Sequence, residues 1–176
     1  MKAIFFDRDG TLNIDPGYIN DPGDMKLYPH AAEILRDIKS RGYKIFVVSN
    51  QSGIGRGRIE PGEYREVNNR FLSLTGGYDV IDDIVYCPHE PGHECCCRKP
   101  GLLLVDIVSE HYDIDYKNSY FVGDKITDIV CGREAGLKTI LVSHGNVLYE
   151  VPHIHEHEGV KPDYVIDSIS QLLDVV

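Results

Sequence analysis

The sequence has 176 residues, of which 42% are hydrophobic and 26% charged, as is typical of a globular domain with its own core. Its formal net charge of -10 argues against a nucleic-acid partner, because phosphate backbones are bound by clusters of Lys and Arg. No apolar run approaches the roughly 18 residues of a membrane span, so we expect a cytoplasmic protein without a membrane partner. We also expect a single domain over residues 1–176 and a monomer.

Short apolar runs alternate with amphipathic stretches, which indicates a parallel sheet covered by helices on both faces. The expected strands are residues 2–6, 44–49, 81–86, 119–122, 139–142 and 164–166, the third being interrupted by Asp82 and Asp83. The expected helices are residues 30–41, 61–74, 102–111, 127–135 and 169–175. We therefore predict a three-layer, doubly wound, Rossmann-like α/β fold. The short connections after the first two strands leave room for a minimal cap or none.

Two carboxylates follow the first strand in the segment Asp7-Arg8-Asp9-Gly10-Thr11. One can act as a nucleophile and metal ligand, while the other acts as a general acid and then a general base. An isolated motif of this kind is equally well explained by an acidic turn. Further polar residues follow other strands, however, and ligands of open parallel sheets bind beyond the carboxyl ends of the strands. These residues are Ser49, Asn50 and Asp124.

Four segments together resemble the haloacid dehalogenase superfamily of phosphatases, in the order found in that family and over most of the chain. They are residues 7–11, 47–50, 98–100, and Gly123-Asp124 with Asp128. The resemblance implies that Asp7 forms an aspartyl-phosphate, with Asp9 as acid and base. It places Ser49, where relatives often have Thr, and Lys99 on the phosphoryl oxygens.

The same resemblance implies a catalytic Mg²⁺, which suits an all-oxygen site. Its ligands would be the Asp7 carboxylate, the backbone carbonyl of Asp9, and Asp124. Asp128 lies one helical turn after Asp124. It either supports Lys99 or a metal-bound water, or is an acidic residue favoured at a helix N-terminus.

Four of the five cysteines lie between positions 87 and 97, and this clustering in a cytosolic chain indicates a metal site rather than disulfides. Three thiolates and one imidazole make a closed, structural zinc site. We expect such a site in a loop of about residues 87–100, with the ligands Cys87, His89, Cys95 and Cys97. His93 competes for a place, Cys96 is left out, and reduced thiols without a metal are the alternative.

This loop resembles a branch of the superfamily that contains the D-glycero-D-manno-heptose 1,7-bisphosphate 7-phosphatases and the histidinol-phosphatase domain of histidine biosynthesis. Residues 15–18, residues 49–57 and Lys125 are more similar to the heptose enzymes, with Pro16 and Gly55 as departures. The resemblance thus implies a phosphorylated sugar that loses its 7-phosphate, in nucleotide-heptose and lipopolysaccharide precursor synthesis. The alternatives are histidinol phosphate as substrate and a non-catalytic, zinc-stabilised binding module.

The resemblance to the heptose enzymes also implies a set of substrate contacts. Arg98 would grip the second phosphate with its planar guanidinium. The full set is Asp15, Pro16, Gly17, Tyr18, Asn50, Gln51, Ser52, Arg56, Arg98 and Lys125.

Three further signals are interpreted as unrelated to function. The alternating histidines at positions 153, 155 and 157 are expected in a solvated loop. Ser143 and His144 lack an acid at a spacing that would suggest a catalytic triad. Cys131 lies in a helical pattern and is expected to be buried.

Overall fold

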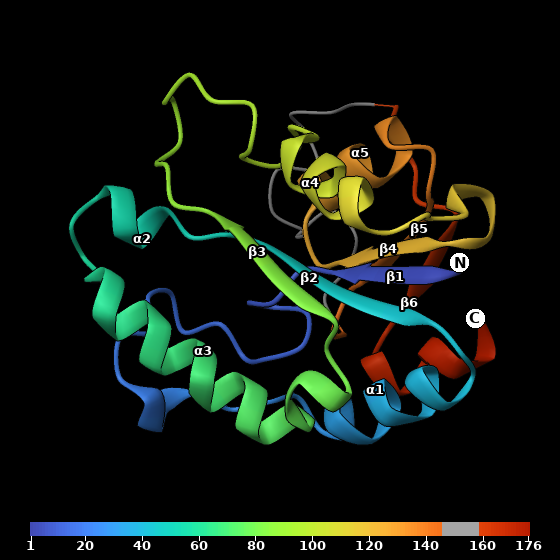
Figure 1. Ribbon diagram of the computed structural model, residues 1–176, viewed down its shortest axis with the longest axis horizontal. Coiled ribbons are helices and arrows are strands. Elements are labelled where there is room, and N and C mark those ends of the chain that lie inside the picture. The colour runs from blue at the N-terminus through green and yellow to red at the C-terminus, as the bar shows by residue number, and fades with distance from the viewer. Residues whose placement is uncertain (146–158) are drawn as a thin grey trace.

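The computed structural model describes residues 1–145 and 159–176. It contains one sheet of six strands, all parallel, in the order β3-β2-β1-β4-β5-β6 (Figure 1). The strand order reverses at β1, and ligands of such sheets bind at this switch point. The strands are β1 (Ala3–Phe6), β2 (Lys44–Asn50), β3 (Asp83–Cys87), β4 (Tyr120–Gly123), β5 (Lys138–Val142) and β6 (Tyr164–Ile166).

Helices cover both faces of the sheet, which confirms the predicted α/β fold. On one face lie α1 (Ala31–Ser40), α3 (Pro61–Thr75) and the C-terminal 3₁₀ helix Ile169–Asp174; on the other lie α4 (Leu103–His111) and α5 (Ile126–Glu134) (Figure 1). The side chains of successive residues in β1 point alternately to the two faces of the sheet. Ile4 and Phe6 pack into the core under α1 and α3, whereas Phe5 packs into the core under α4.

The helix boundaries follow from local chemistry. α3 begins with Pro61, whose missing N–H costs nothing in the first turn. The side chains of Glu60 and Glu63 form a reciprocal capping box there. The helix ends at Gly76, which has φ +113° and so adopts the left-handed conformation that glycine tolerates best.

The C-terminal segment, expected to be a helix over residues 169–175, is the 3₁₀ helix Ile169–Asp174. This helix has six residues, and its bonds include those from the N–H of Gln171 to the oxygen of Ser168 and from Val175 to Leu172. A segment this short gains few bonds from α-helical geometry, so the tighter turn competes well.

The connections after β1 and β2, residues 7–30 and 51–60, are too short to hold a large cap domain, as expected of a fold with little or no cap. Among the described residues between β1 and α1 lie the 3₁₀ helix Pro22–Asp24 and isolated bridges, but no cap domain. The connection after β2 contains the four-residue helix α2 (Ser52–Gly55). The carboxyl ends of the central strands are therefore left open. None of the helices in residues 1–145 and 159–176 has the length and apolarity needed to cross a membrane.

Candidate active site

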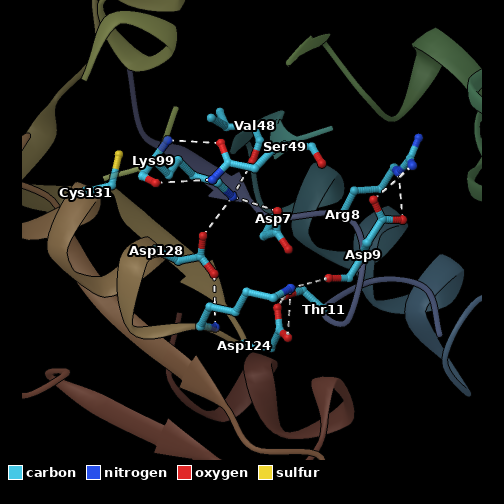
Figure 2. A network of polar contacts seen from close by, with 12 residues as sticks. Asp7, Arg8, Asp9, Thr11, Val48, Ser49, Lys99, Asp124, Asp128 and Cys131 are labelled. Atoms are coloured by element: carbon cyan, nitrogen blue, oxygen red, sulfur yellow. Dashed lines mark hydrogen bonds and ion pairs between the residues drawn. The ribbon is translucent and has the colours of Figure 1, made fainter. Parts of the chain in front are cut away.

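The buried ammonium of Lys99 lies between two carboxylates at the carboxyl edge of the sheet (Figure 2). Its Nζ is 2.6 Å from Asp7 Oδ1 and 2.7 Å from Asp128 Oδ1, and it donates to the carbonyl oxygen of Val48 at 2.6 Å. Burial lowers the pKa of Lys99, but the charges of Asp128 and Asp7 outweigh it and raise that pKa above its ordinary value. Lys99 is therefore a fixed cation next to the Asp7 carboxylate.

Asn50, at the end of β2, holds the backbone of Lys99. Its Oδ1 accepts from the Lys99 N–H at 2.9 Å, and its Nδ2 donates to the Lys99 carbonyl oxygen at 3.2 Å. Asn50 also lines the cavity described below, where it was expected to contact substrate. The paired amide contacts add a second role, which is to fix the position of Lys99.

Asp128 performs both of the tasks that the sequence left open. It lies in the first turn of α5, where its Oδ2 accepts from the backbone N–H of Lys125 at 3.1 Å. Its other oxygen, Oδ1, forms the ion pair with Lys99. The same carboxylate thus caps the helix and supports the active-site lysine.

Asp7, Asp124 and Asp128 form a group that could hold a cation, with one carboxylate oxygen of each within 4.8 Å of the others. Burial and the charges of Asp7 and Asp128 raise the pKa of Asp124 to about 7, against the opposing effect of Lys125. Thr11 donates to Asp124 Oδ1 at 3.1 Å. A divalent cation at this position would relieve the repulsion among the carboxylates.

Gly10 makes room for Asp124. It has φ +92°, and a Cβ atom on it would clash with the Asp124 carboxylate. Only glycine combines this conformation with so close an approach. Lys125 also contacts Asp124, with its Nζ 3.4 Å from Asp124 Oδ2 and 3.2 Å from the carbonyl oxygen of Asp9. That carbonyl was the expected third magnesium ligand.

Four N–H groups bond to the Asp9 carboxylate. Arg8 donates from Nε to Oδ1 at 3.0 Å and from Nη2 to Oδ2 at 2.9 Å, and Asn13 donates to Oδ1 at 3.0 Å. Gln51 Nε2 donates to Asp9 Oδ2 and, at 2.8 Å, to Ser49 Oγ. Burial raises the pKa of Asp9, but the charge of Arg8 and these hydrogen bonds outweigh it and hold the pKa below its ordinary value.

A cavity of about 460 Å³ opens above these groups. It brings together most of the predicted site residues: Asp7, Asp9, Asp15, Gly17, Tyr18, Ser49, Asn50, Gln51, Ser52, Arg98, Lys99 and Lys125. Among the described residues, Pro16, Arg56 and Asp124 do not line it. Arg56 instead lies 3.9 Å from Glu90 in an exposed ion pair. Three residues that were considered for other roles, His93, Cys95 and Asp128, also line the cavity, as do Gly53, Pro91, Gly92, Pro100 and Thr127, for which no role was predicted.

The cysteine loop forms a second group that could hold a metal, consisting of Cys87, His89, Cys95 and Cys97 within 4.8 Å of one another. Cys97 Sγ lies 3.0 Å from Cys87 Sγ and 3.3 Å from His89 Nδ1. Burial, followed by the hydrogen bond with Cys97, raises the pKa of Cys87 to about 12, so a cation would be needed to favour its thiolate. These four are the residues that the sequence predicted.

The two residues left open in this loop lie outside the four-residue group. Cys96 is exposed, and the His93 ring stacks on that of His89 at 4.5 Å between centroids. The loop is tied to the active site, because Arg98 donates to the His89 carbonyl oxygen at 3.2 Å and Gln51 N donates to that of Cys87 at 2.7 Å.

The sequence did not predict the contacts that hold the carboxylates of Asp9 and Asp124. Arg8, Thr11 and Asn13 lie in or beside the acidic motif, and their proximity was the one available signal. Asn68, which accepts from Arg8 Nη1, is 60 residues away, and nothing in the sequence connects the two.

The three sequence features that were interpreted as unrelated to function lie in different parts of the chain. The histidines at positions 153, 155 and 157 lie outside the described residues. Ser143 Oγ donates to Asp167 at 3.1 Å, while the ring of His144 stacks on Tyr28. Cys131 is buried in α5.

Comparisons with known proteins point in one direction. A model of the HAD-hydrolase-like (haloacid dehalogenase-like) family matches residues 96–172. A Haemophilus influenzae protein named D-glycero-beta-D-manno-heptose-1,7-bisphosphate 7-phosphatase is 40% identical over 97% of this chain and 94% of its own length. A Chlorobaculum tepidum protein named D-glycero-D-manno-heptose-1,7-bisphosphate 7-phosphatase is 33% identical over 97% and 91%. The crystal structure of D,D-heptose 1,7-bisphosphate phosphatase from B. bronchiseptica, complexed with magnesium and phosphate, matches with a TM-score of 0.85 at 27% identity over 100% of both chains.

Proposed function

The chain belongs to the heptose-bisphosphate phosphatase family of the haloacid dehalogenase-like hydrolases, and we propose that it hydrolyses the 7-phosphate of D-glycero-D-manno-heptose 1,7-bisphosphate. Such a reaction would serve nucleotide-heptose and lipopolysaccharide precursor synthesis. The observation that carries the proposal is the position of Lys99, which lies against the Asp7 carboxylate at the wall of the cavity. A carboxylate beside a fixed cation suits attack on an anionic phosphate, whose charge must be neutralised.

In the proposed reaction, Asp7 attacks phosphorus and the ester P–O bond breaks. Asp9 gives a proton to the departing sugar oxygen. It then takes a proton from the water that attacks the phosphorus of the aspartyl-phosphate, releasing inorganic phosphate and regenerating Asp7. Lys99 Nζ neutralises the charge of the phosphoryl oxygens, and Ser49 Oγ donates a hydrogen bond to them. Gln51, which donates to both Ser49 Oγ and Asp9 Oδ2, orients the Ser49 hydroxyl relative to the Asp9 carboxylate.

Mg²⁺ is the proposed catalytic ion, held by Asp7, Asp124 and the carbonyl oxygen of Asp9. The crowded carboxylates fit this ion, since hard oxygen ligands suit it and a cation offsets their repulsion. When bound, it would neutralise charge on the transferring phosphoryl group. The magnesium and phosphate in the B. bronchiseptica structure support the assignment.

Zn²⁺ is the proposed occupant of the cysteine group, with a structural role. Three sulfur ligands and one imidazole nitrogen are a typical closed zinc set that leaves no position for a substrate. Arg98 and Lys99 follow Cys97 directly, so the ion would hold the segment that carries both cations. Arg98 is then placed at the cavity to bind the second phosphate of the substrate.

The substrate assignment is tested by comparing kcat/KM on both anomers of the heptose bisphosphate, on histidinol phosphate and on an aryl phosphate. We expect a clear preference for a heptose bisphosphate, because the relatives compared above carry that name and none supports the histidinol alternative. A preference for histidinol phosphate would overturn the substrate. The variant Asp7→Asn should be folded and inactive, and phosphate release by it would exclude Asp7 as nucleophile. No activity in the unmodified protein with Mg²⁺ would favour a binding module.

A further inference from the structure

Arg8, between the two acidic residues of the motif, is among the most buried side chains of the protein. It is 1% exposed and lies behind Asp9, outside the set of described residues that line the cavity. Its Nε and Nη2 bond to separate oxygens of Asp9 at 3.0 and 2.9 Å. Such a two-point contact fixes both the position and the plane of a carboxylate.

The far side of Arg8 is held by helix α3. Nη1 donates to Oδ1 of Asn68, and the guanidinium carbon lies 5.4 Å from the centre of the Tyr64 ring. Asn68 and Tyr64 are one helical turn apart on α3, so a single helix face supports the guanidinium. A continuous chain of contacts thus runs from α3 through Arg8 to Asp9.

The four hydrogen bonds that Asp9 accepts differ in how easily they can break. A carboxylate offers about four lone-pair positions, and here each oxygen accepts two N–H groups. For Asp9 to exchange a proton with a leaving oxygen or a water, one donor must give way. Gln51 borders the cavity and keeps Ser49 as a second acceptor, so it can yield its place. Arg8 and Asn13 do not border the cavity, so their hydrogen bonds to Asp9 remain.

We propose that Arg8 is a positioning residue that fixes the Asp9 carboxylate for proton transfer to the leaving oxygen, and that Asn68 on α3 fixes Arg8. The inference rests on the proposed function, in which Asp9 is the general acid and base. Arg8 touches neither the cavity nor the reacting atoms and acts through Asp9 alone. Its loss should therefore resemble a partial loss of Asp9.

The test measures kcat/KM on an alkyl phosphate, such as the heptose bisphosphate, and on 4-nitrophenyl phosphate. The value of kcat/KM reports the first chemical step, in which the leaving group departs from phosphorus. An alkoxide leaving group needs a proton from the general acid far more than nitrophenolate does. In Arg8→Lys we expect a loss of about 30- to 100-fold on the alkyl phosphate and less than about threefold on the aryl phosphate. Asn68→Ala, at a half-buried helix position, should show the same selectivity with a smaller loss. The neighbouring exposed Asn69→Ala is the matched control and should change neither value.

A double-mutant cycle separates positioning from general structural damage. If Arg8 acts through Asp9, Arg8→Lys should have little further effect in an Asp9→Asn background. Equal losses on the two substrates, or a full additional loss in the Asp9→Asn background, would overturn the inference while leaving the phosphatase assignment intact. An unmodified protein that hydrolyses neither substrate would overturn the proposed function, and the inference with it.

Discussion

Lys99 Nζ lies 2.6 Å from Asp7 Oδ1, although 92 residues separate the two in the sequence. Asp7 follows β1 at the centre of the sheet, and Lys99 lies near the end of the cysteine loop that starts at the end of β3. Asn50, at the end of the intervening β2, bonds to the Lys99 backbone. Three adjacent strand ends therefore combine to place one cation against one carboxylate.

Replacing Lys99 by Met should damage both catalysis and folding. The change leaves the buried carboxylates of Asp7 and Asp128 without their shared cation, and breaking such a pair typically costs about 3–5 kcal/mol. We expect kcat to fall by about 10²- to 10³-fold, as when one charge-stabilising donor is lost. Urea denaturation without added divalent cations measures the loss of stability, and phosphate release measures the loss of kcat. Lys117→Met, at an exposed position, should change neither; unchanged stability in Lys99→Met would contradict the ion-pair argument.

Replacing Gly10 by Ala should weaken the proposed magnesium site. The added Cβ would clash with the Asp124 carboxylate, and the left-handed conformation of an alanine costs about 1–3 kcal/mol. We expect a lower unfolding free energy and a higher Mg²⁺ concentration for half-maximal activity. Gly62→Ala is the matched control, because a Cβ there meets nothing within 4 Å and helix α3 should gain about 0.5–1 kcal/mol. An unchanged Mg²⁺ requirement in Gly10→Ala would argue against Asp124 as a ligand.

The sequence located those candidate site residues that lie at the ends of predicted strands. Asp7, Ser49 and Asp124 follow predicted strands, and parallel pairing brings all strand ends to one edge. The cysteine group was predictable because its four members lie in one short loop. Both inferences use only local spacing and the geometry of parallel sheets.

Side-chain partners across the fold were less predictable. Spacing places Asn50 and Gln51 at the site but does not say where their amides point, and both contact protein groups. Likewise, the support of Arg8 by Asn68 requires the packing of α3 against the motif, which no local pattern encodes. The C-terminal helix was predicted in position, but propensity does not separate α from 3₁₀ geometry in six residues.

Replacing Cys97 by Ser should release the metal of the cysteine group, whereas Cys96→Ser should retain it. Cys97 is buried within 3.3 Å of His89 Nδ1, and Cys96 is exposed outside the group. Loss of a structural metal is among the most destabilising changes, and we expect about 3–5 kcal/mol. Activity should fall as well, because Arg98 and Lys99 directly follow Cys97. Elemental analysis, denaturation and kcat/KM of both variants test this. Full activity without bound metal would exclude the structural role.

Replacing Asp82 by Asn should produce a stability loss that depends on pH. The Asp82 side chain, 8% exposed, pairs with Lys39 and Lys44 and accepts from the backbone N–H of Ile45. Burial raises the pKa of Asp82, but these hydrogen bonds outweigh it and lower that pKa in the folded state. These contacts also explain why an acidic residue precedes β3. We expect a loss of about 1–3 kcal/mol at pH 7 in Asp82→Asn, the range for hydrogen bonds to charged groups.

The sign of the pH effect follows from the lowered pKa. The stabilisation by Asp82 is fully present above the unfolded-state pKa of about 3.9, and is lost as the pH falls through the lower folded-state value. The difference in unfolding free energy between Asp82→Asn and the unmodified protein should therefore be constant between pH 7 and about pH 5, and shrink below about pH 4. Urea denaturation across this range measures it, with the exposed Asp79→Asn as a control that should show little difference at any pH. A difference that stays the same into the acid range would mean that Asp82 stabilises the fold by packing and not by its charge.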